Sequence, residues 1–122
     1  MKAALQAVHP VLMVRDVAAS IRFYAHLGFQ FAFADADVDP KYAGVRRDHV
    51  ELHFQWHVAE DFSSGDRPTY RFLVHEVDAL SAEFSSGQLE LDRTDVSDTP
   101  WGTREFHLRD PDRNGLQFYR LL

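Results

Sequence analysis

Residues 9–17 read HPVLMVRDV, and residues 69–77 read TYRFLVHEV. Each stretch is a run rich in apolar and β-branched residues that ends at an acidic residue followed by valine. A run of this composition is typical of a buried β-strand. Because the same pattern occurs once in each half of the chain, we expect two copies of one supersecondary unit.

An amphipathic stretch follows each of these predicted strands. Apolar residues recur at helical spacing over residues 17–27 and again over residues 77–84. Asp16 is placed to cap the start of the first helix. Gly28 and Gly87 are placed to end the two helices, because glycine readily adopts the left-handed conformation of a helix end.

Short strand-like runs follow each predicted helix and are separated by turns rich in aspartate, proline and glycine. These runs lie at about 29–34, 44–47 and 50–56 in the first half and about 89–96, 103–109 and 115–121 in the second. The sequence therefore predicts the order β-α-β-β-β twice, in modules of about residues 1–60 and 68–122 with a connector at 60–68. We expect one α+β domain over residues 1–122, because neither half can bury enough surface alone.

The composition restricts the possible partners of this chain. Its 122 residues carry 19 acidic and 13 basic side chains, a net charge of −6, whereas proteins that bind nucleic-acid phosphates are normally basic. No apolar run approaches the roughly 20 residues of a membrane span, and the first residues lack the apolar core of a signal peptide. We therefore expect no nucleic-acid partner, no membrane partner and a cytoplasmic location. The absence of cysteine leaves histidine and carboxylates as the strong metal ligands.

The repeat and a set of short motifs resemble the vicinal oxygen chelate superfamily, which includes glyoxalase I, extradiol dioxygenases, fosfomycin-resistance enzymes and bleomycin-resistance proteins. The motifs span nearly the whole chain: PVL at 10–12, RDV at 15–17, YAGVRRD at 42–48, PWG at 100–102, REF at 104–106 and RDPDRN at 109–114. The resemblance is greatest to the bleomycin-resistance branch. It implies that the two βαβββ modules form a cupped mixed sheet, the glyoxalase/bleomycin-resistance fold.

The resemblance to the bleomycin-resistance branch also implies a function. Proteins of this branch form homodimers with ligand grooves at the subunit interface, often with exchange of the N-terminal strand, and Pro10 matches the proline near that strand. They sequester a cationic glycopeptide drug without chemistry and so confer antibiotic resistance. We therefore expect a homodimer that sequesters a small aromatic or cationic molecule. Immunity to, or sensing of, a metabolite of the same organism is a further alternative.

The enzymatic branches of the superfamily hold a metal ion on strand positions that face the cup. The resemblance places the first of these positions at His9 and its counterpart in the second module at Thr69, which is a poor ligand. On the last strand the position usually held by glutamate falls on Gln117. Strand alternation directs Glu51 and His53 into the cup as well, so the candidate metal ligands are His9, Glu51 or His53, and Gln117.

This candidate ligand set is weak. Metal ions held by nitrogen and carboxylate ligands usually have three or more protein ligands. The neutral amide of Gln117 cannot act as the general base that glyoxalase-like chemistry needs. We therefore expect no catalytic residue, no bound metal and no other cofactor. The alternative is a metal-dependent lyase, isomerase or dioxygenase of the same superfamily.

The candidate ligand-binding residues are large aromatic or polar side chains that the strand pattern does not require for the core. They are Phe33, Tyr42, Glu51, His53, Arg71, Trp101, Gln117 and Tyr119. The acidic residues within 35–39 favour a cationic ligand. Arg71 favours a carboxylate or phosphate instead and would repel a cation, so the identity of the ligand stays open.

Overall fold

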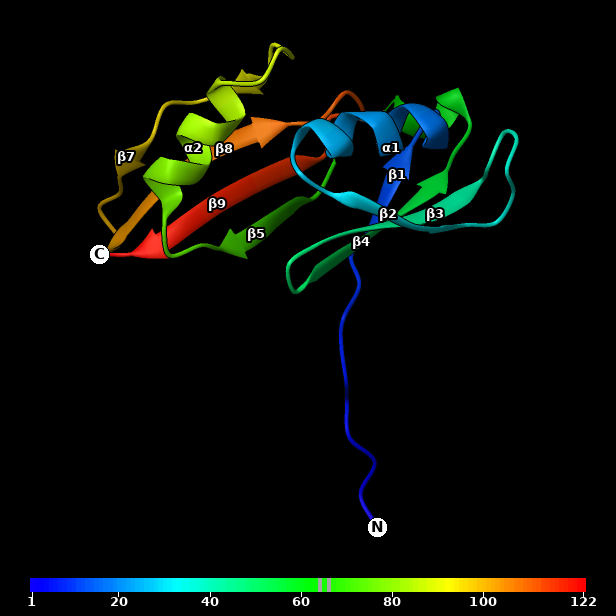
Figure 1. Cartoon of the computed structure of the whole chain (residues 1–122), viewed down its shortest axis with the longest axis horizontal. Helices are drawn as coiled ribbons and strands as arrows, with labels where there is room; N and C mark the ends of the chain where they lie inside the picture. Colours follow the sequence, from blue (N-terminus) through cyan, green and yellow to red (C-terminus); the bar gives the residue numbers. More distant parts are fainter. Residues whose placement is uncertain (64, 66) are drawn as a thin grey trace.

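The protein is described by a computed structural model that covers residues 1–63, 65 and 67–122, so Ser64 and Asp66 of the predicted connector lie outside the described residues. Figure 1 shows two β-sheets side by side, each with one helix packed on the same side of the molecule. In chain order the elements are β1 (Val11–Val14), α1 (Val17–His26), β2 (Gln30–Ala34), β3 (Tyr42–Arg47), β4 (Val50–Trp56), a short 3-10 helix (Ala59–Phe62), β5 (Thr69–Leu73), α2 (Val77–Ser85), β6 (Asp92–Arg93), β7 (Ser97–Asp98), β8 (Thr103–Arg109) and β9 (Gly115–Leu121).

The two sheets share one topology. The first has the strand order β1-β4-β3-β2, and the second has the order β5-β9-β8-β6, with β7 also pairing with β8. In each sheet the first strand runs parallel to the last, and the remaining neighbours are antiparallel. The α+β class and the two mixed βαβββ modules predicted from the repeat are therefore confirmed.

The predicted strand at 89–96 is wrong as a continuous element. Within this range only Asp92–Arg93 is a strand, Ser97–Asp98 forms a second short strand just beyond it, and both pair with the same edge of β8. Between them the backbone N–H of Thr94 still donates to the His107 carbonyl at 2.8 Å, but the His107 N–H donates at 3.0 Å to the Thr94 hydroxyl and not to a backbone carbonyl. This side-chain contact replaces a backbone ladder bond and divides the strand in two.

The starts and ends of the two helices test the predicted capping residues. Asp16 caps α1 as predicted, since its carboxylate accepts a hydrogen bond of 3.0 Å from the N–H of Ala19. Gly28, at φ +86°, supplies the left-handed turn after α1. α2 also ends two residues before its glycine, since its last helical residue is Ser85, but Gly87 does not have the positive φ of Gly28, and the hydroxyl of Ser86 donates to the carbonyl of Glu83.

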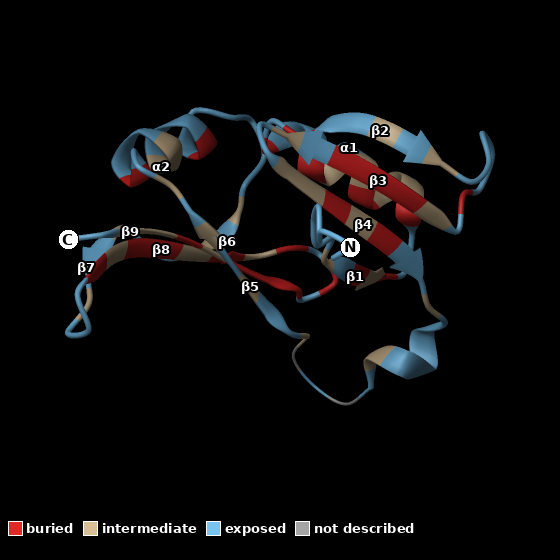
Figure 2. Ribbon diagram, turned by 90° about the horizontal axis from the view of Figure 1, so that it is seen from below, coloured by how far each residue is buried: buried red, intermediate tan, exposed pale blue. Residues whose placement is uncertain are grey.

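The hydrophobic core lies between each sheet and its helix. Leu52 and Phe54 of β4 are fully buried beneath α1, and Phe106 of β8 is fully buried in the other module. Figure 2 shows the buried residues following the central strands of both sheets. The two modules are joined at the core by the hydroxyl of Tyr24, which donates a hydrogen bond of 2.8 Å to Asp110.

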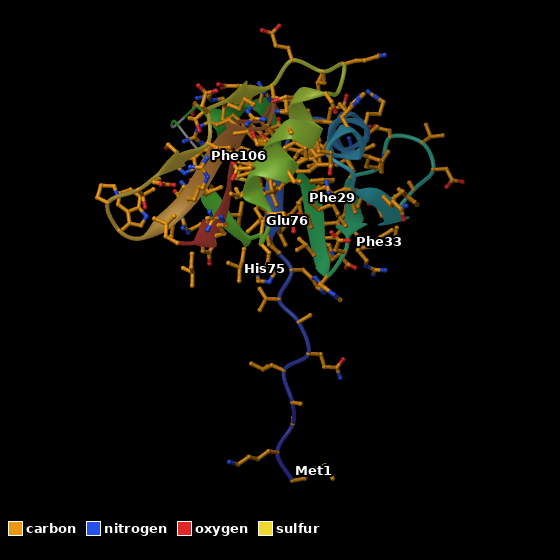
Figure 3. All side chains as sticks on the ribbon, turned by 60° about the vertical axis from the view of Figure 1, so that its left-hand side comes forward. Met1, Phe29, Phe33, His75, Glu76 and Phe106 are labelled. Atoms are coloured by element: carbon orange, nitrogen blue, oxygen red, sulfur yellow. The ribbon has the colours of Figure 1, made fainter. Side chains whose placement is uncertain are left out.

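The opposite face of both sheets, here called the open face, is covered by no helix of the described chain. An N-terminal arm, residues 1–10, leaves this side of the molecule as an extended segment (Figures 1 and 3). The side chains of Leu5 and Val8 on this arm are exposed. Among the described residues, no helix is both long and apolar enough to cross a membrane.

Candidate functional site

The open face of the first sheet carries a group of hydrogen-bonded and aromatic side chains that we call the first cluster. Its members are His9, Phe33, Tyr42, Arg46, Glu51 and His53. Strand alternation explains the position of Glu51 and His53, because Leu52 and Phe54 between and beside them point into the core. The structure thus brings together four of the predicted ligand-binding residues, Phe33, Tyr42, Glu51 and His53.

A chain of hydrogen bonds runs through the first cluster. The Nε2 atom of His53 lies 2.7 Å from Glu51, and its Nδ1 atom lies 2.8 Å from the hydroxyl of Tyr42. Arg46 donates to the other oxygen of Glu51. Hydrogen bonds from His53 and Arg46 lower the pKa of Glu51 to about 2, so its carboxylate is ionised and can only accept. The proton of a neutral His53 therefore resides on Nε2, and Tyr42 donates to Nδ1.

Aromatic rings surround His53. The ring of His9 stacks on it at 4.8 Å, and the ring of Phe33 meets it edge to face at 5.1 Å. Phe33 reaches this position because it lies over Gly44, where a Cβ would stand 2.2 Å from the Phe33 ring. Glycine at position 44 is therefore required for the aromatic arrangement in the first cluster.

The open face of the second sheet carries the second cluster, whose members are Arg71, Thr103, Glu105, His107, Gln117 and Tyr119. Its centre is Glu105, whose side chain is only 3% exposed. One carboxylate oxygen accepts from the Thr103 hydroxyl at 2.6 Å and from Arg71 at 3.2 Å. The other lies 2.7 Å from His107 Nε2. Arg71 also donates to Gln117 Oε1 at 2.6 Å and lies over the Tyr119 ring.

Burial of Glu105 opposes its ionisation, but the hydrogen bonds from Thr103, Arg71 and His107 outweigh this effect. Together they lower the pKa of Glu105 to about 2. The charge of Arg71 is thus balanced by a carboxylate at hydrogen-bond distance. Three predicted residues, Arg71, Gln117 and Tyr119, meet in this second cluster.

The registers of the two sheets identify equivalent positions on the open face. In the first sheet Val11, His53 and Gly44 form one cross-strand row, and in the second sheet Arg71, Gln117 and His107 form the equivalent row. In the neighbouring row, Thr69 pairs with Gly115 in the second sheet. Gln117 is therefore the counterpart of His53, and Gly115 is the counterpart of Glu51.

Trp101 is the predicted residue that the structure leaves apart from both clusters. It lies in the turn between β7 and β8 and is 68% exposed. Within the described part of the chain it makes no ring contact with either cluster.

Sequence reasoning missed Glu105, His107 and Arg46. A signal for the first two was present, since the spacing Glu-X-His occurs at 51–53 and again at 105–107. In both places the histidine Nε2 lies 2.7 Å from the glutamate.

The first cluster also contains the atoms that could hold a metal ion. One ligand atom from each of His9, Glu51 and His53 lies within 4.8 Å of the others. The second sheet offers no matching set in the described residues. Thr69 and Gly115 stand at the positions equivalent to His9 and Glu51, and Gln117 Oε1, at the position equivalent to His53, already accepts from Arg71. The residues therefore fit a three-ligand site within the first module alone.

Comparison with known proteins agrees with this fold. The sequence pattern of the Glyoxalase/Bleomycin resistance protein/Dioxygenase superfamily matches residues 6–118, and the chain belongs to this superfamily. A search of curated proteins finds no match.

Solved structures of two bleomycin-binding proteins and of one glyoxalase-related enzyme are similar to this chain. A bleomycin-binding protein from Streptomyces verticillus, complexed with copper(II)-bleomycin, is 30% identical with a TM-score of 0.74 over 96% of this chain and 97% of its own. A bleomycin-binding protein complexed with bleomycin has a TM-score of 0.80 at 20% identity, covering 97% of this chain and 100% of its own. A glyoxalase-related enzyme from Clostridium phytofermentans has a TM-score of 0.77 at 16% identity, covering 98% of each chain. The fold alone thus serves both binding proteins and enzymes.

Proposed function

We propose that this chain is a bleomycin-resistance-like binding protein that sequesters a small aromatic or cationic molecule, without chemistry, in a groove on the open face at a dimer interface. The observation that carries this proposal is the likeness to the bleomycin-binding protein of Streptomyces verticillus, at 30% identity over nearly the full length of both chains.

The electrostatics of the open face support an aromatic or cationic ligand. Glu105 balances Arg71, and Glu51 balances Arg46, so neither of these two arginines presents an uncompensated positive charge. The objection that Arg71 would repel a cation is therefore weakened. The half-exposed rings of Phe33 and Tyr42 supply flat surfaces on which an aromatic group or a cation can stack.

The proposed dimer is supported by two uncovered parts of the chain. The N-terminal arm leaves the molecule with Leu5 and Val8 exposed, and the open face exposes Phe33 and Leu73. Apolar surface of this kind is normally covered by a partner. In the proposed arrangement the arm reaches the second copy, and His9 at its base lies beside the groove. Light scattering tests this, with a mass of about twice 14.1 kDa expected and a monomer mass contradicting it.

Titration calorimetry with copper-loaded bleomycin tests the binding function. The wild type is expected to bind, and a Phe33→Leu variant is expected to bind about fivefold more weakly, since one stacked aromatic ring contributes about 1 kcal/mol. Phe62→Leu is the matched control, because the Phe62 ring contacts Arg15 and Arg67 and belongs to neither cluster. Absence of binding heat at micromolar protein would remove bleomycin as a ligand.

A metal-dependent enzyme of the same superfamily is the second candidate, and the proximity of His9, Glu51 and His53 favours it. These three residues would hold a divalent ion, which when bound supplies Lewis-acid activation of a substrate oxygen. Elemental analysis of protein purified without chelator tests this candidate. Stoichiometric metal that is lost in a His9→Ala variant would support it, and metal-free protein would argue against it.

A further inference from the structure

The hydrogen bonds of the second cluster determine which atoms of His107 and Gln117 remain available to a ligand. The two residues are direct cross-strand neighbours on β8 and β9. Both side chains point to the open face, because Phe106 and Phe118, which alternate with them, are buried in the core.

Glu105 fixes the tautomer of His107. The carboxylate of Glu105 forms a salt bridge with Arg71 and accepts the Thr103 hydroxyl, so it is ionised and cannot donate. The proton of a neutral His107 must therefore reside on Nε2, 2.7 Å from Glu105. The Nδ1 atom keeps a bare lone pair, and among the described residues no group donates to it. The His107 side chain is 40% exposed, so this acceptor is accessible.

Arg71 fixes the orientation of the Gln117 amide. A guanidinium group can only donate, so the atom that lies 2.6 Å from Arg71 Nη1 must be the amide oxygen of Gln117. The amide nitrogen of Gln117 then carries two N–H groups, for which the described part of the chain offers no acceptor. The acceptor His107 Nδ1 and the donor amide N–H of Gln117 thus lie side by side on the open face.

A small hollow lies beside this donor–acceptor pair. Its volume is about 50 Å³, and His107, Gln117, Thr69 and Arg109 contribute to its lining. This volume exceeds the roughly 10–15 Å³ that a cavity needs to hold one water molecule. The hollow therefore has room for a planar group of a few heavy atoms.

We propose that His107 Nδ1 and the Gln117 amide N–H form a recognition pair for an amide edge of the ligand, as found in a primary carboxamide, a lactam or a pyrimidinone. The ligand carbonyl accepts from Gln117, while the adjacent ligand N–H donates to His107. A carboxylate lacks the N–H and would place its lone pairs against Nδ1. This assignment rests on the proposed function, that the open face binds a small molecule, and it adds the chemical class of one ligand group.

The tautomer can be measured directly in the wild-type protein by nitrogen NMR of labelled histidine. The measurement is made at alkaline pH, on the neutral form of the ring. The spectrum of His107 is expected to show a protonated Nε2 and a bare Nδ1. A protonated Nδ1 would overturn the proposal, because the ligand N–H would then face a donor.

Three small probes test the recognition itself. Benzamide is expected to shift the His107 Nδ1 and Gln117 side-chain signals. N,N-Dimethylbenzamide, which keeps the ring and carbonyl but has no N–H, is expected to bind about fivefold more weakly, the value of one hydrogen bond of about 1 kcal/mol. Benzoate tests the carboxylate and is expected to bind more weakly than benzamide. Equal affinity for benzamide and either of the other two probes would overturn the proposal.

A pair of matched variants locates the effect. Gln117→Glu removes the N–H donors and keeps an acceptor for Arg71, so benzamide binding is expected to fall about fivefold or more. Gln55→Glu makes the same change on the open face of the first sheet, opposite Tyr42, and is expected to leave benzamide binding unchanged. An equal loss in both variants, or in neither, contradicts the recognition pair.

The test of the recognition pair and the test of the proposed function can give different results. Binding of copper-loaded bleomycin without any benzamide response would reject the recognition pair and leave the binding function intact. Benzamide binding that depends on Gln117, without bleomycin binding, would support the recognition pair and reject bleomycin as the ligand.

Discussion

The first and second clusters are built on equivalent positions of two sheets with one topology, yet they use their polar groups differently. In the first cluster Gly44 leaves room for the ring of Phe33, and two histidines stand at the surface with Glu51. In the second cluster the position equivalent to Gly44 is His107, and a buried Glu105 ties Arg71, Thr103 and His107 together. The first module therefore offers rings and candidate metal ligands, whereas the second offers a fixed array of polar atoms in which the charges of Arg71 and Glu105 offset each other.

The largest expected effect comes from removing the centre of the second cluster. Glu105→Ala leaves Arg71, Thr103 and His107 without their shared acceptor, and we expect the free energy of unfolding to fall by about 2 kcal/mol. Chemical denaturation measures this change. Asp78→Ala is the control, because it breaks an exposed ion pair with Arg104 and should change stability little. Equal losses in the two variants would mean that Glu105 has no special structural role.

Acid titration compares the two glutamates with each other. The pKa values of Glu51 and Glu105 are both lowered from 4.5 to about 2 in the folded chain. The unfolded chain therefore takes up these protons first, and each carboxylate stabilises the fold above its ordinary pKa and loses that contribution as the pH falls toward 2. We expect the free energy of unfolding to fall between about pH 5 and pH 2. Glu105→Gln and Glu51→Gln should each make this dependence shallower, and an unchanged slope in either would contradict the ion pairing assigned to that residue.

A smaller effect on stability is expected when a side chain is added at position 44, where the first cluster has glycine and the second cluster has His107. The Cβ of Gly44→Ala would collide with the Phe33 ring, which is half-exposed and can swing outward. We expect a stability loss of about 1 kcal/mol, together with a loss of affinity for copper-loaded bleomycin comparable to that of Phe33→Leu. Gly87→Ala is the control, since an added Cβ there meets only the Phe84 carbonyl at 3.5 Å. Full bleomycin affinity in Gly44→Ala would show that Phe33 does not contribute to bleomycin binding.

The smallest expected effect removes one hydroxyl. Tyr42→Phe deletes the donor to His53 Nδ1 and keeps the ring, so stability should change by about 1 kcal/mol or less. Nitrogen NMR should then show His53 with a bare, unbonded Nδ1, as predicted for His107. A protonated Nδ1 in the wild-type protein would contradict the direction assigned to the Tyr42 hydrogen bond.

The sequence predicted the fold well where a local pattern determines the structure. Strand alternation correctly directed Glu51 and His53 to the face opposite Leu52 and Phe54, and the Asp16 cap required no tertiary information. The break in the 89–96 strand was not predictable in this way, because it depends on Thr94 meeting the backbone of a distant strand.

The candidate site was predicted only in part for the same reason. Which residues share a row is decided by strand register, which pairs Gln117 with Arg71 and makes Gln117 the counterpart of His53 and not of Glu51. Glu105 and His107 lie on a strand that was predicted, but their importance comes from Arg71 on another strand. Contacts between strands carry this information, and the order of residues along one strand does not.

A chemical-shift map of the isotope-labelled protein during titration with metal-free bleomycin tests the central claim most directly. If the open face is the binding surface, the signals that move will belong to β3 and β4 of the first module and to β8 and β9 of the second. Saturable shifts confined to the helical side of the sheets would contradict the account, whereas no shifts at millimolar drug would remove bleomycin as the ligand.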